Sequence, residues 1–341
     1  MKKNFLTVAA IMVVAFFVST EIAKAADVTF SGQIRTRWDA TEQFGGTDTA
    51  AGAGDGLPAA NNETDDAVFS SVRLAAKANV NESTSAFIQL QSTRNWGELP
   101  AGHATANGGG EDNASNTAND NDSSVGVHQA YMQFKNFLNI PMGFDAKIGR
   151  QEVLLDGWRL FGNTIWTPGM QSHDMVRLDH KHDNMALTLG YILEQEGGRQ
   201  NDPGDHNDSD TWFAYLNLKG VLGGQFSGYY VYMDQQGANL DRGVRFSTIG
   251  GRQAGKMFGL DYRGEFYYQV GDAPGINNGS VTDSANRVAN GNDVDFDAYM
   301  FGIRVGKTAS NTAMKPSLTV WYDYLSGTSD SDGRSGDWSS F

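Results

Sequence analysis

The feature that most constrains the fold of this sequence is a repeated alternation of apolar and polar residues with a period of two. Near the amino terminus, Phe30, Ile34 and Trp38 alternate with the basic residues Arg35 and Arg37. The same alternation recurs over residues 72–80, 130–135, 261–270, 299–305 and 318–324. Because successive side chains of a β-strand point to opposite faces, the pattern predicts strands with one apolar and one polar face.

The first residues have the pattern of a cleavable export signal. Lys2 and Lys3 precede an apolar run over residues 5–18, and Ala23-Lys24-Ala25 closes the segment. The run is shorter than the roughly 20 residues that a spanning helix needs. We therefore expect residues 1–25 to be a signal peptide and residues 26–341 to be the exported protein. No later segment has the length of an apolar spanning helix, so a membrane protein of this sequence would have to cross with strands.

Composition narrows the classes of protein further. The chain has 341 residues, no cysteine and a formal net charge of -14. Without cysteine, an exported chain cannot be a disulfide-stapled scaffold, and it must fold through extensive backbone pairing or a large core. The negative charge argues against nucleic acid as a partner. Acidic and amide residues gather in clusters such as residues 111–122 and 201–210, between the predicted strands.

The connections between the predicted strands are alternately long and short. About 13 strands can be counted from the alternation and turn signals. The long connections fall at residues 40–66, 96–123, 152–170, 196–209, 236–243, 271–294 and from 326 on. The short ones fall near residues 81–82, 138–142, 182–184, 221–224, 253–256 and 308–313. Long external loops and short periplasmic turns are typical of a transmembrane, antiparallel, up-and-down β-barrel, which is the all-β fold that we expect, in the cell outer membrane.

In such a barrel the apolar side chains face lipid and the charged ones can line water inside. The alternative is that the charged residues form paired ladders with a purely structural role, since cross-strand ion pairs are common on polar sheet faces. The candidate pore-lining residues are Arg35, Arg37, Arg73, Lys77, Lys147, Arg150, Arg177, Asp179, Asp261, Arg263, Glu265, Arg304 and Asp323.

Several short motifs resemble the alginate export family of outer-membrane porins. They are Lys-Ile-Gly-Arg-Gln-Glu-Val over residues 147–153, Asp-Gly-Trp-Arg-Leu over 156–160, Ser-His-Asp-Met-Val-Arg over 172–177, Asp261-Tyr262 with Glu265 and residues 269–271, and the stretch 321–327 with Gly336, Asp337 and Phe341. The resemblance covers roughly residues 27–341 and implies a barrel of about 18 strands, an even number as in bacterial barrels generally. It also implies a lumen that passes an anionic polysaccharide, stabilised by inward Arg and Lys.

The sequence leaves two alternatives open for Arg150 and two for the segment 154–170. Arg150 shares its parity with the outward Ala146 and Ile148, and a bulge near Gly149 would turn it inward. The segment 154–170 folds either into the lumen as a constriction or against the outer interface as an aromatic girdle. The candidate constriction residues are Trp158, Arg159, Phe161 and Trp166.

Residues 327–341 have the composition of a polar loop, and an odd count of about 13 strands would not close; we therefore expect the chain to lack its C-terminal strands.

The sequence offers little for catalysis or for metal binding. It has no Gly-x-Ser-x-Gly motif, and its histidines have no recognisable nucleophile partner, so we predict no enzyme and no catalytic residue. His180 and His182 with Asp179 and Asp183 could bind a metal, but solvated residues at a turn are favoured, because a metal site needs three or four converging ligands. Calcium at the acidic stretches 119–122, 208–210 and 330–333 is the alternative to ordinary solvated loops, and we predict no cofactor and no metal.

Three functions from different classes remain. The favoured one is an outer-membrane channel for the passive passage of polar or anionic solutes, with polysaccharide export as its narrower form. The others are a secreted, soluble, β-rich binding module and a barrel enzyme. The channel implies the lipid bilayer, lipopolysaccharide, and small polar solutes or anionic oligosaccharide as partners, and no nucleic acid.

Overall fold

A computed structural model describes residues 27–42, 64–96, 125–139, 142–195, 208–235, 244–273, 294–312, 314–326 and 337–338. The expected signal peptide lies outside these residues. The strands are β1 (Asp27–Glu42), β2 (Thr64–Asn79), β3 (Thr84–Asn95), β4 (Gly126–Phe134), β5 (Asp145–Gln151), β6 (His173–His182), β7 (Met185–Gln195), β8 (Ser209–Val221), β9 (Gly224–Gln235), β10 (Val244–Met257), β11 (Leu260–Ala273), β12 (Val294–Thr308), β13 (Ser317–Leu325) and β14 (Asp337–Trp338). A short 3₁₀ helix covers Phe137–Asn139.

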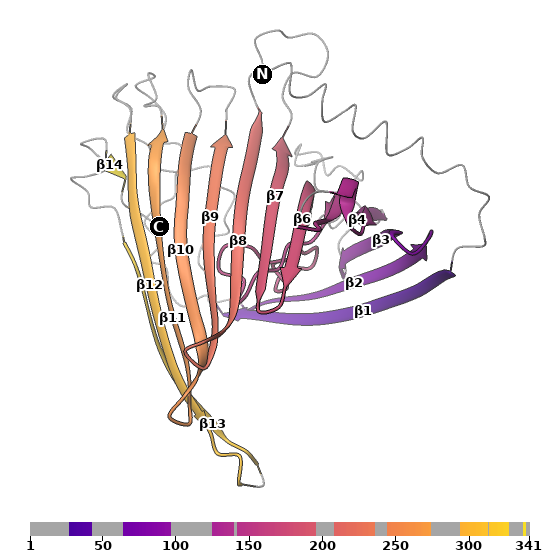
Figure 1. The fold of residues 1–341 in the computed structure, drawn as a ribbon. Helices are drawn as coiled ribbons and strands as arrows, with labels where there is room; N and C mark the ends of the chain where they lie inside the picture. Colours follow the sequence, from indigo (N-terminus) through magenta and orange to yellow (C-terminus); the bar gives the residue numbers. More distant parts are fainter. Residues whose placement is uncertain are drawn as a thin grey trace, which may run out of the picture.

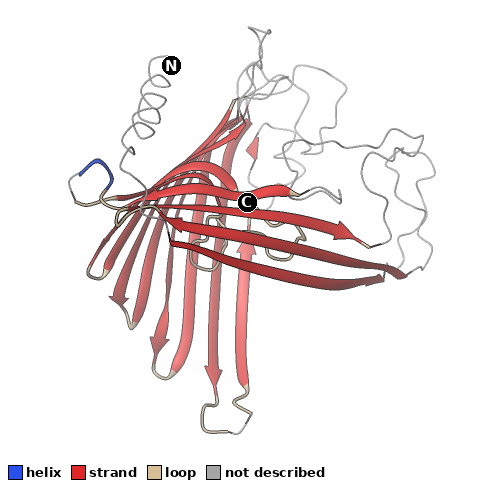
Figure 2. Ribbon diagram, turned by 90° about the vertical axis from the view of Figure 1, so that its right-hand side faces the viewer, coloured by secondary structure: helices blue, strands red, loops and turns tan. Residues whose placement is uncertain are grey.

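Strands β1 to β13 form a single sheet in which each strand pairs antiparallel with the next one along the chain. The two-residue β14 pairs parallel with the start of β12. The sheet is strongly curved (Figures 1 and 2). In the described residues β1 and β13 each have one sheet neighbour, so the sheet is open between these two strands. This confirms the all-β, up-and-down arrangement of about 13 strands. No helix among the described residues is long and apolar enough to cross a membrane.

The connections fall in the predicted order, although the one predicted as short at residues 135–144 is longer than the one predicted as long at residues 236–243. The short ones join β2 to β3, β4 to β5, β6 to β7, β8 to β9, β10 to β11 and β12 to β13. One predicted turn, at residues 253–256, is wrong, because β10 continues to Met257 and the chain reverses at Phe258 and Gly259. Both of these residues have positive φ, at 53° and 75°, as the central residues of a type I′ hairpin turn do.

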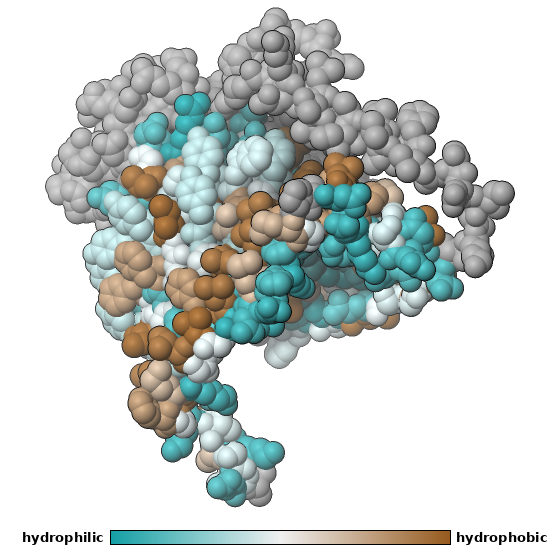
Figure 3. All heavy atoms as spheres, viewed as in Figure 1, coloured by the Kyte–Doolittle hydropathy of each residue, from teal (hydrophilic) through white to brown (hydrophobic). Residues whose placement is uncertain are grey.

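The two faces of the sheet differ in exposure and in composition. Along β12, Tyr299, Phe301 and Ile303 are exposed, whereas Ala298 and Met300, which alternate with them, are fully buried. Other exposed apolar side chains on the first of these faces are Phe30, Ile34, Val72, Leu74, Trp212, Ile249, Phe266 and Val320. Figure 3 shows apolar side chains in brown on the part of this surface that is in view. The exposed face is therefore the convex one, and it carries the apolar half of the alternation.

The residues between β5 and β6, 152–172, return to the concave face, and we call them the inward segment. Its Leu155 and Phe161 are buried in one apolar cluster with Phe213 of β8 and Tyr267 of β11. The rings of Phe161 and Phe213 lie 4.6 Å apart between their centroids. The core of the molecule thus lies between the sheet and this segment.

Candidate functional site

The inward segment contacts strands from both ends of the sheet, which places it across the concave face. Arg35 of β1 donates hydrogen bonds to the carbonyl oxygens of Ile165 and Thr167, both at 2.5 Å. Near the opposite edge, Arg159 lies 3.2 Å from the carboxylate of Asp323 on β13. Only the inner side of a curved sheet allows one segment to reach both edge strands.

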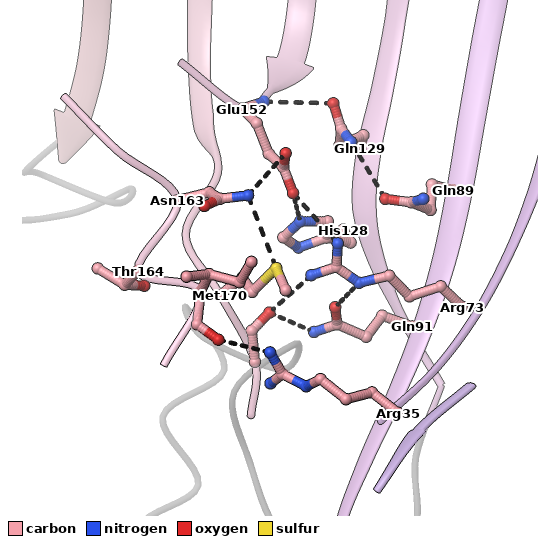
Figure 4. A network of polar contacts seen from close by, with 12 residues as sticks. Arg35, Arg73, Gln89, Gln91, His128, Gln129, Glu152, Asn163, Thr164 and Met170 are labelled. Atoms are coloured by element: carbon pink, nitrogen blue, oxygen red, sulfur yellow. Dashed lines mark hydrogen bonds and ion pairs between the residues drawn. The ribbon is translucent and has the colours of Figure 1, made fainter. Parts of the chain in front are cut away.

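The first tether of the inward segment is the carboxylate of Glu152 (Figure 4). Glu152 Oε1 lies 2.7 Å from Nε2 of His128 on β4 and 3.2 Å from Nη1 of Arg73 on β2. Its Oε2 accepts a hydrogen bond from Nδ2 of Asn163 at 3.1 Å. Because Asn163 lies further along the same segment, one carboxylate joins two strands to both the start and the return of the inward segment.

A β-bulge brings His128 to this carboxylate. The register between β3 and β4 shifts so that Gln89 pairs with Gln129 and Leu90 pairs with Val127, which leaves His128 without a partner opposite it. Bulges re-aim side chains in this way. As a result both His128 and its neighbour Gln129 reach Glu152. His128 is fully buried. The side-chain oxygen of Gln129 accepts a hydrogen bond from the backbone amide of Glu152 at 3.3 Å.

The surroundings of Glu152 favour its charged form. Burial alone would raise the pKa of this carboxyl, but the hydrogen bonds from His128 and Asn163 and the charge of Arg73 outweigh burial and lower the pKa below its ordinary value. The carboxylate is therefore ionised at neutral pH, as a partner for Arg73 requires.

The return arm of the segment is held through its backbone (Figure 4). Gln91 of β3 donates from Nε2 to the Gly169 carbonyl at 2.6 Å and accepts from Nε of Arg73 at 2.6 Å. Arg73 also lies 3.4 Å from the Gly169 carbonyl oxygen through Nη2. Without these donors the Gly169 carbonyl would be left without a partner, a state that costs free energy when the group is buried.

The second tether is the carboxylate of Asp156, whose side chain is only 3% exposed. It accepts hydrogen bonds from the hydroxyl of Tyr215 and from Nε2 of Gln225, each at 3.1 Å, and from the hydroxyl of Tyr229. Arg252 of β10 lies 3.5 Å away as its counter-ion. The middle of the segment is thereby fixed to β8, β9 and β10.

The third tether is Arg159, which joins the far side of the concave face. Its Nη2 lies 2.7 Å from Glu265 of β11 and 3.2 Å from Asp323 of β13. Glu265 also faces Arg263 at 3.2 Å, and Asp323 faces Arg304 at 3.8 Å. Arg263 and Arg304 are directly opposite in the sheet register, so the two acids offset a like-charge pair that would otherwise repel.

Several other predicted pore-lining residues of the strands form pairs with neighbouring side chains. Arg37 forms an ion pair with Asp39, and Arg177 bonds Asp179 at 2.9 Å, which also accepts from Thr188 at 2.8 Å. The ammonium group of Lys147 lies 3.8 Å from the ring centroid of Tyr131. Lys77 is exposed, and Asp261 pairs with Lys256 at 3.0 Å near a turn.

Arg150 departs from the expected geometry. The registers of β5 with β4 and with β6 run through Gly149 without a shift, so no bulge turns Arg150 inward. It stays on the parity of Ile148 and pairs with Asp174 at 2.9 Å. Gly149 has a φ of 122°, and a Cβ there would lie 2.3 Å from the carbonyl oxygen of Ala130, so this position requires glycine for close approach of the strands.

The aromatic residues of the inward segment divide between packing and exposure. Phe161 is buried against β8, whereas Trp158 is 40% and Trp166 is 62% exposed. Trp158 packs over Gly162, and a Cβ added at Gly162 would lie 2.7 Å from the Cβ of Trp158. Since Arg159 and Phe161 both contact concave-face residues, the arrangement matches a segment folded inward and not a girdle at the outer interface.

In the part of the chain that the structure describes, no three potential metal ligands come together. His180 is buried against Phe144, with 5.4 Å between ring centroids, and is not the solvated residue that we expected. His182 is exposed and lies 3.4 Å from Asp183. Of the acidic stretches considered for calcium, residues 119–122 and 330–333 lie outside the described residues.

The residues that hold the segment were not among the sites predicted from the sequence; they are Glu152, Asp156, His128, Gln91, Tyr215, Tyr229 and Arg252. Their positions along the chain gave no signal of convergence, apart from the acidic residues that flank Val153-Leu154-Leu155 in an otherwise apolar stretch.

A family model described as alginate export matches residues 49–341. A search of curated protein sequences finds no match. Among solved structures, the chain is similar to OccD3 (OpdP) of Pseudomonas aeruginosa, with 11% identity, a TM-score of 0.43, and coverage of 91% of this chain and 59% of that one. It is also similar to OmpF of Salmonella typhi in complex with daunomycin, with 10% identity, a TM-score of 0.37, and coverage of 90% and 93%. The chain thus spans 59% of the length of the OccD3 chain.

Proposed function

Because this chain belongs to the alginate export family of outer-membrane proteins, we propose that its curved sheet forms the wall of a channel for polar solutes. The observation that carries the proposal is the separation of the two faces. The convex face exposes apolar side chains, as lipid requires, and the concave face holds ionic residues around an inward segment. Transport, and not catalysis, is the activity proposed.

The channel needs closure, because backbone groups facing lipid must be paired. In the described residues β1 and β13 each have one open edge. We propose that further strands close the barrel along these two edges. The lipid bilayer then surrounds the convex face, and lipopolysaccharide is the expected neighbour at the outer rim.

The solute class follows from the charges of the concave face. Arg159, Arg263 and Arg304 meet Glu265 and Asp323 there, so bases exceed acids in this group. Rings of fixed charge set ion selectivity in narrow passages. We therefore propose that small polar or anionic solutes pass, with anionic oligosaccharide as the narrower candidate.

Conductance across planar lipid bilayers tests the proposal. Arg304, which is partly exposed on the concave face, is the residue to change: Arg304→Glu should shift ion selectivity toward cations. The reciprocal variant Asp323→Asn removes a negative charge beside it and should shift selectivity toward anions. A protein that inserts into bilayers without conducting, or equal selectivity in both variants, would contradict the proposed channel.

A further inference from the structure

The start of the inward segment depends on a single carboxylate. Glu152 joins Arg73 of β2, His128 of β4 and Asn163 of the return arm at distances of 2.7 to 3.2 Å. The third tether differs, since Arg159 there binds two acids that also have other cations as partners. Loss of one charge at Glu152 therefore weakens contacts to two strands and to the return arm together.

We propose that Glu152 is the positioning residue of the inward segment, and that its charge keeps the segment folded across the concave face and so sets the width of the passage. The effect on the width of the passage rests on the proposed channel, whereas the contacts of Glu152 do not depend on it. Nothing in the contacts of Glu152 requires it to touch a solute, because its side chain is only 14% exposed.

The charges around Glu152 explain why its own charge matters. The groups that face it are Arg73 of β2 and His128 of β4, and those close enough to act on it or on Arg73 are Arg35 of β1, Tyr131 of β4 and Lys147 of β5. Without the carboxylate charge, Arg35 and Arg73 would face each other with no acid between them. Both hold backbone carbonyls of the return arm, so their repulsion would loosen that arm.

The tether through Glu152 is lost in acid, because protonation removes the carboxylate charge that holds Arg73 and His128. Because the pKa of Glu152 is lowered, the tether is fully present above the ordinary carboxyl pKa, about 4.3. It is lost as the pH falls through the lowered value. The passage should therefore be narrow at neutral pH and wider in acid.

Conductance against pH is the first measurement, made on the full chain. In the parent protein, conductance should rise as the pH falls through the lowered pKa of Glu152, below the ordinary carboxyl range. Glu152→Gln, which keeps the shape and removes the charge, should conduct more at pH 7 and show no such acid rise. The matched control is Glu194→Gln at the end of β7, which contacts His173 at 3.9 Å and should behave as the parent does. Parent-like conductance and an unchanged acid rise in Glu152→Gln would overturn the proposal.

A second measurement does not depend on conduction. The chain has no cysteine, so Val153→Cys introduces one thiol at a position that is 1% exposed beside Glu152. At pH 7, a bulky water-soluble maleimide should label this thiol about tenfold faster when Glu152→Gln is also present, as expected for loss of a hydrogen bond to a charged group. Equal rates would overturn the positioning role. Faster labelling in a protein that fails to conduct would uphold that role and reject the channel.

Discussion

Asp156 shows how one residue fixes the middle of the inward segment to three strands. Its buried carboxylate meets Tyr215, Tyr229, Gln225 and Arg252, which come from three strands. Removing a buried carboxylate that accepts several hydrogen bonds destabilises the fold, because each buried donor left without an acceptor costs free energy.

We therefore predict that Asp156→Asn destabilises the protein by on the order of 3 kcal/mol, since Arg252 would be left buried without its counter-ion. Urea-induced unfolding in lipid vesicles, followed by tryptophan fluorescence, measures the change in the free energy of unfolding. The control is Asp183→Asn at the turn after β6, whose carboxylate is 85% exposed beside His182, and the expected loss there is below about 1 kcal/mol. Equal losses in the two variants would contradict the tether.

The sequence could predict which strand residues face inward but not which loop residues converge on them. Arg73 and Glu265 were identified because alternation is local, so each strand reports its own faces. Glu152 and Asp156 look like ordinary acids of a connection until the segment folds back over the sheet. His128 was missed because a bulge changes parity at one residue, and no pattern in a single strand reveals a shift that depends on its neighbour.

At the scale of elements, inward glycines make room for inward aromatic rings. A Cβ at Gly190 of β7 would lie 2.1 Å from a ring carbon of Phe213, and one at Gly250 of β10 would lie 2.1 Å from a ring carbon of Tyr267. Both rings are buried beneath the inward segment, so they cannot swing away. The two glycines thus allow neighbouring strands to carry bulky residues on the same concave face.

We predict that Gly190→Ala and Gly250→Ala each cost about 1–3 kcal/mol, as overpacking in a dense core does. Thermal unfolding in detergent, followed by circular dichroism at a β-sheet wavelength, measures the loss. Gly264→Ala is the matched control, because a Cβ there has no atom within 4 Å. This variant should be neutral or slightly stabilising, since alanine loses less backbone entropy than glycine in a strand. A loss at Gly264 as large as at Gly190 would refute the packing argument.

The strands and most turns were predictable because both depend on neighbours in sequence. The turn between β10 and β11 was not, since it was predicted at residues 253–256 and lies at Phe258 and Gly259. Gly255 lies within the predicted range but serves strand pairing, because a Cβ there would lie 2.7 Å from the Cα of Gly224 on β9. Close approach of strands and tight turns both call for glycine, and sequence alone does not distinguish them.

For the whole molecule, the two faces of the sheet impose opposite solvent requirements. The formal charge of -14 coexists with a convex face that exposes side chains such as Phe30, Trp212 and Phe301. A water-soluble protein would be expected to cover so large an apolar surface. A lipid environment removes the cost of that surface, while the ionic residues stay with the inward segment on the other face.

This assignment predicts a period of two in solvent contact along β12. Single spin labels at residues 298–305, introduced one at a time as cysteines in a chain that has none, should alternate in lipid vesicles. Labels at Tyr299, Phe301 and Ile303 should collide mainly with oxygen, which concentrates in lipid. Labels at Gly302 and Arg304 should be shielded from oxygen and collide more with a water-soluble nickel complex. Reversed phases would place the ionic face toward lipid, and a uniform response would mean that β12 does not separate the two solvents. Either outcome would reject the membrane-spanning sheet, because the alternation follows from strand geometry alone once one face meets lipid.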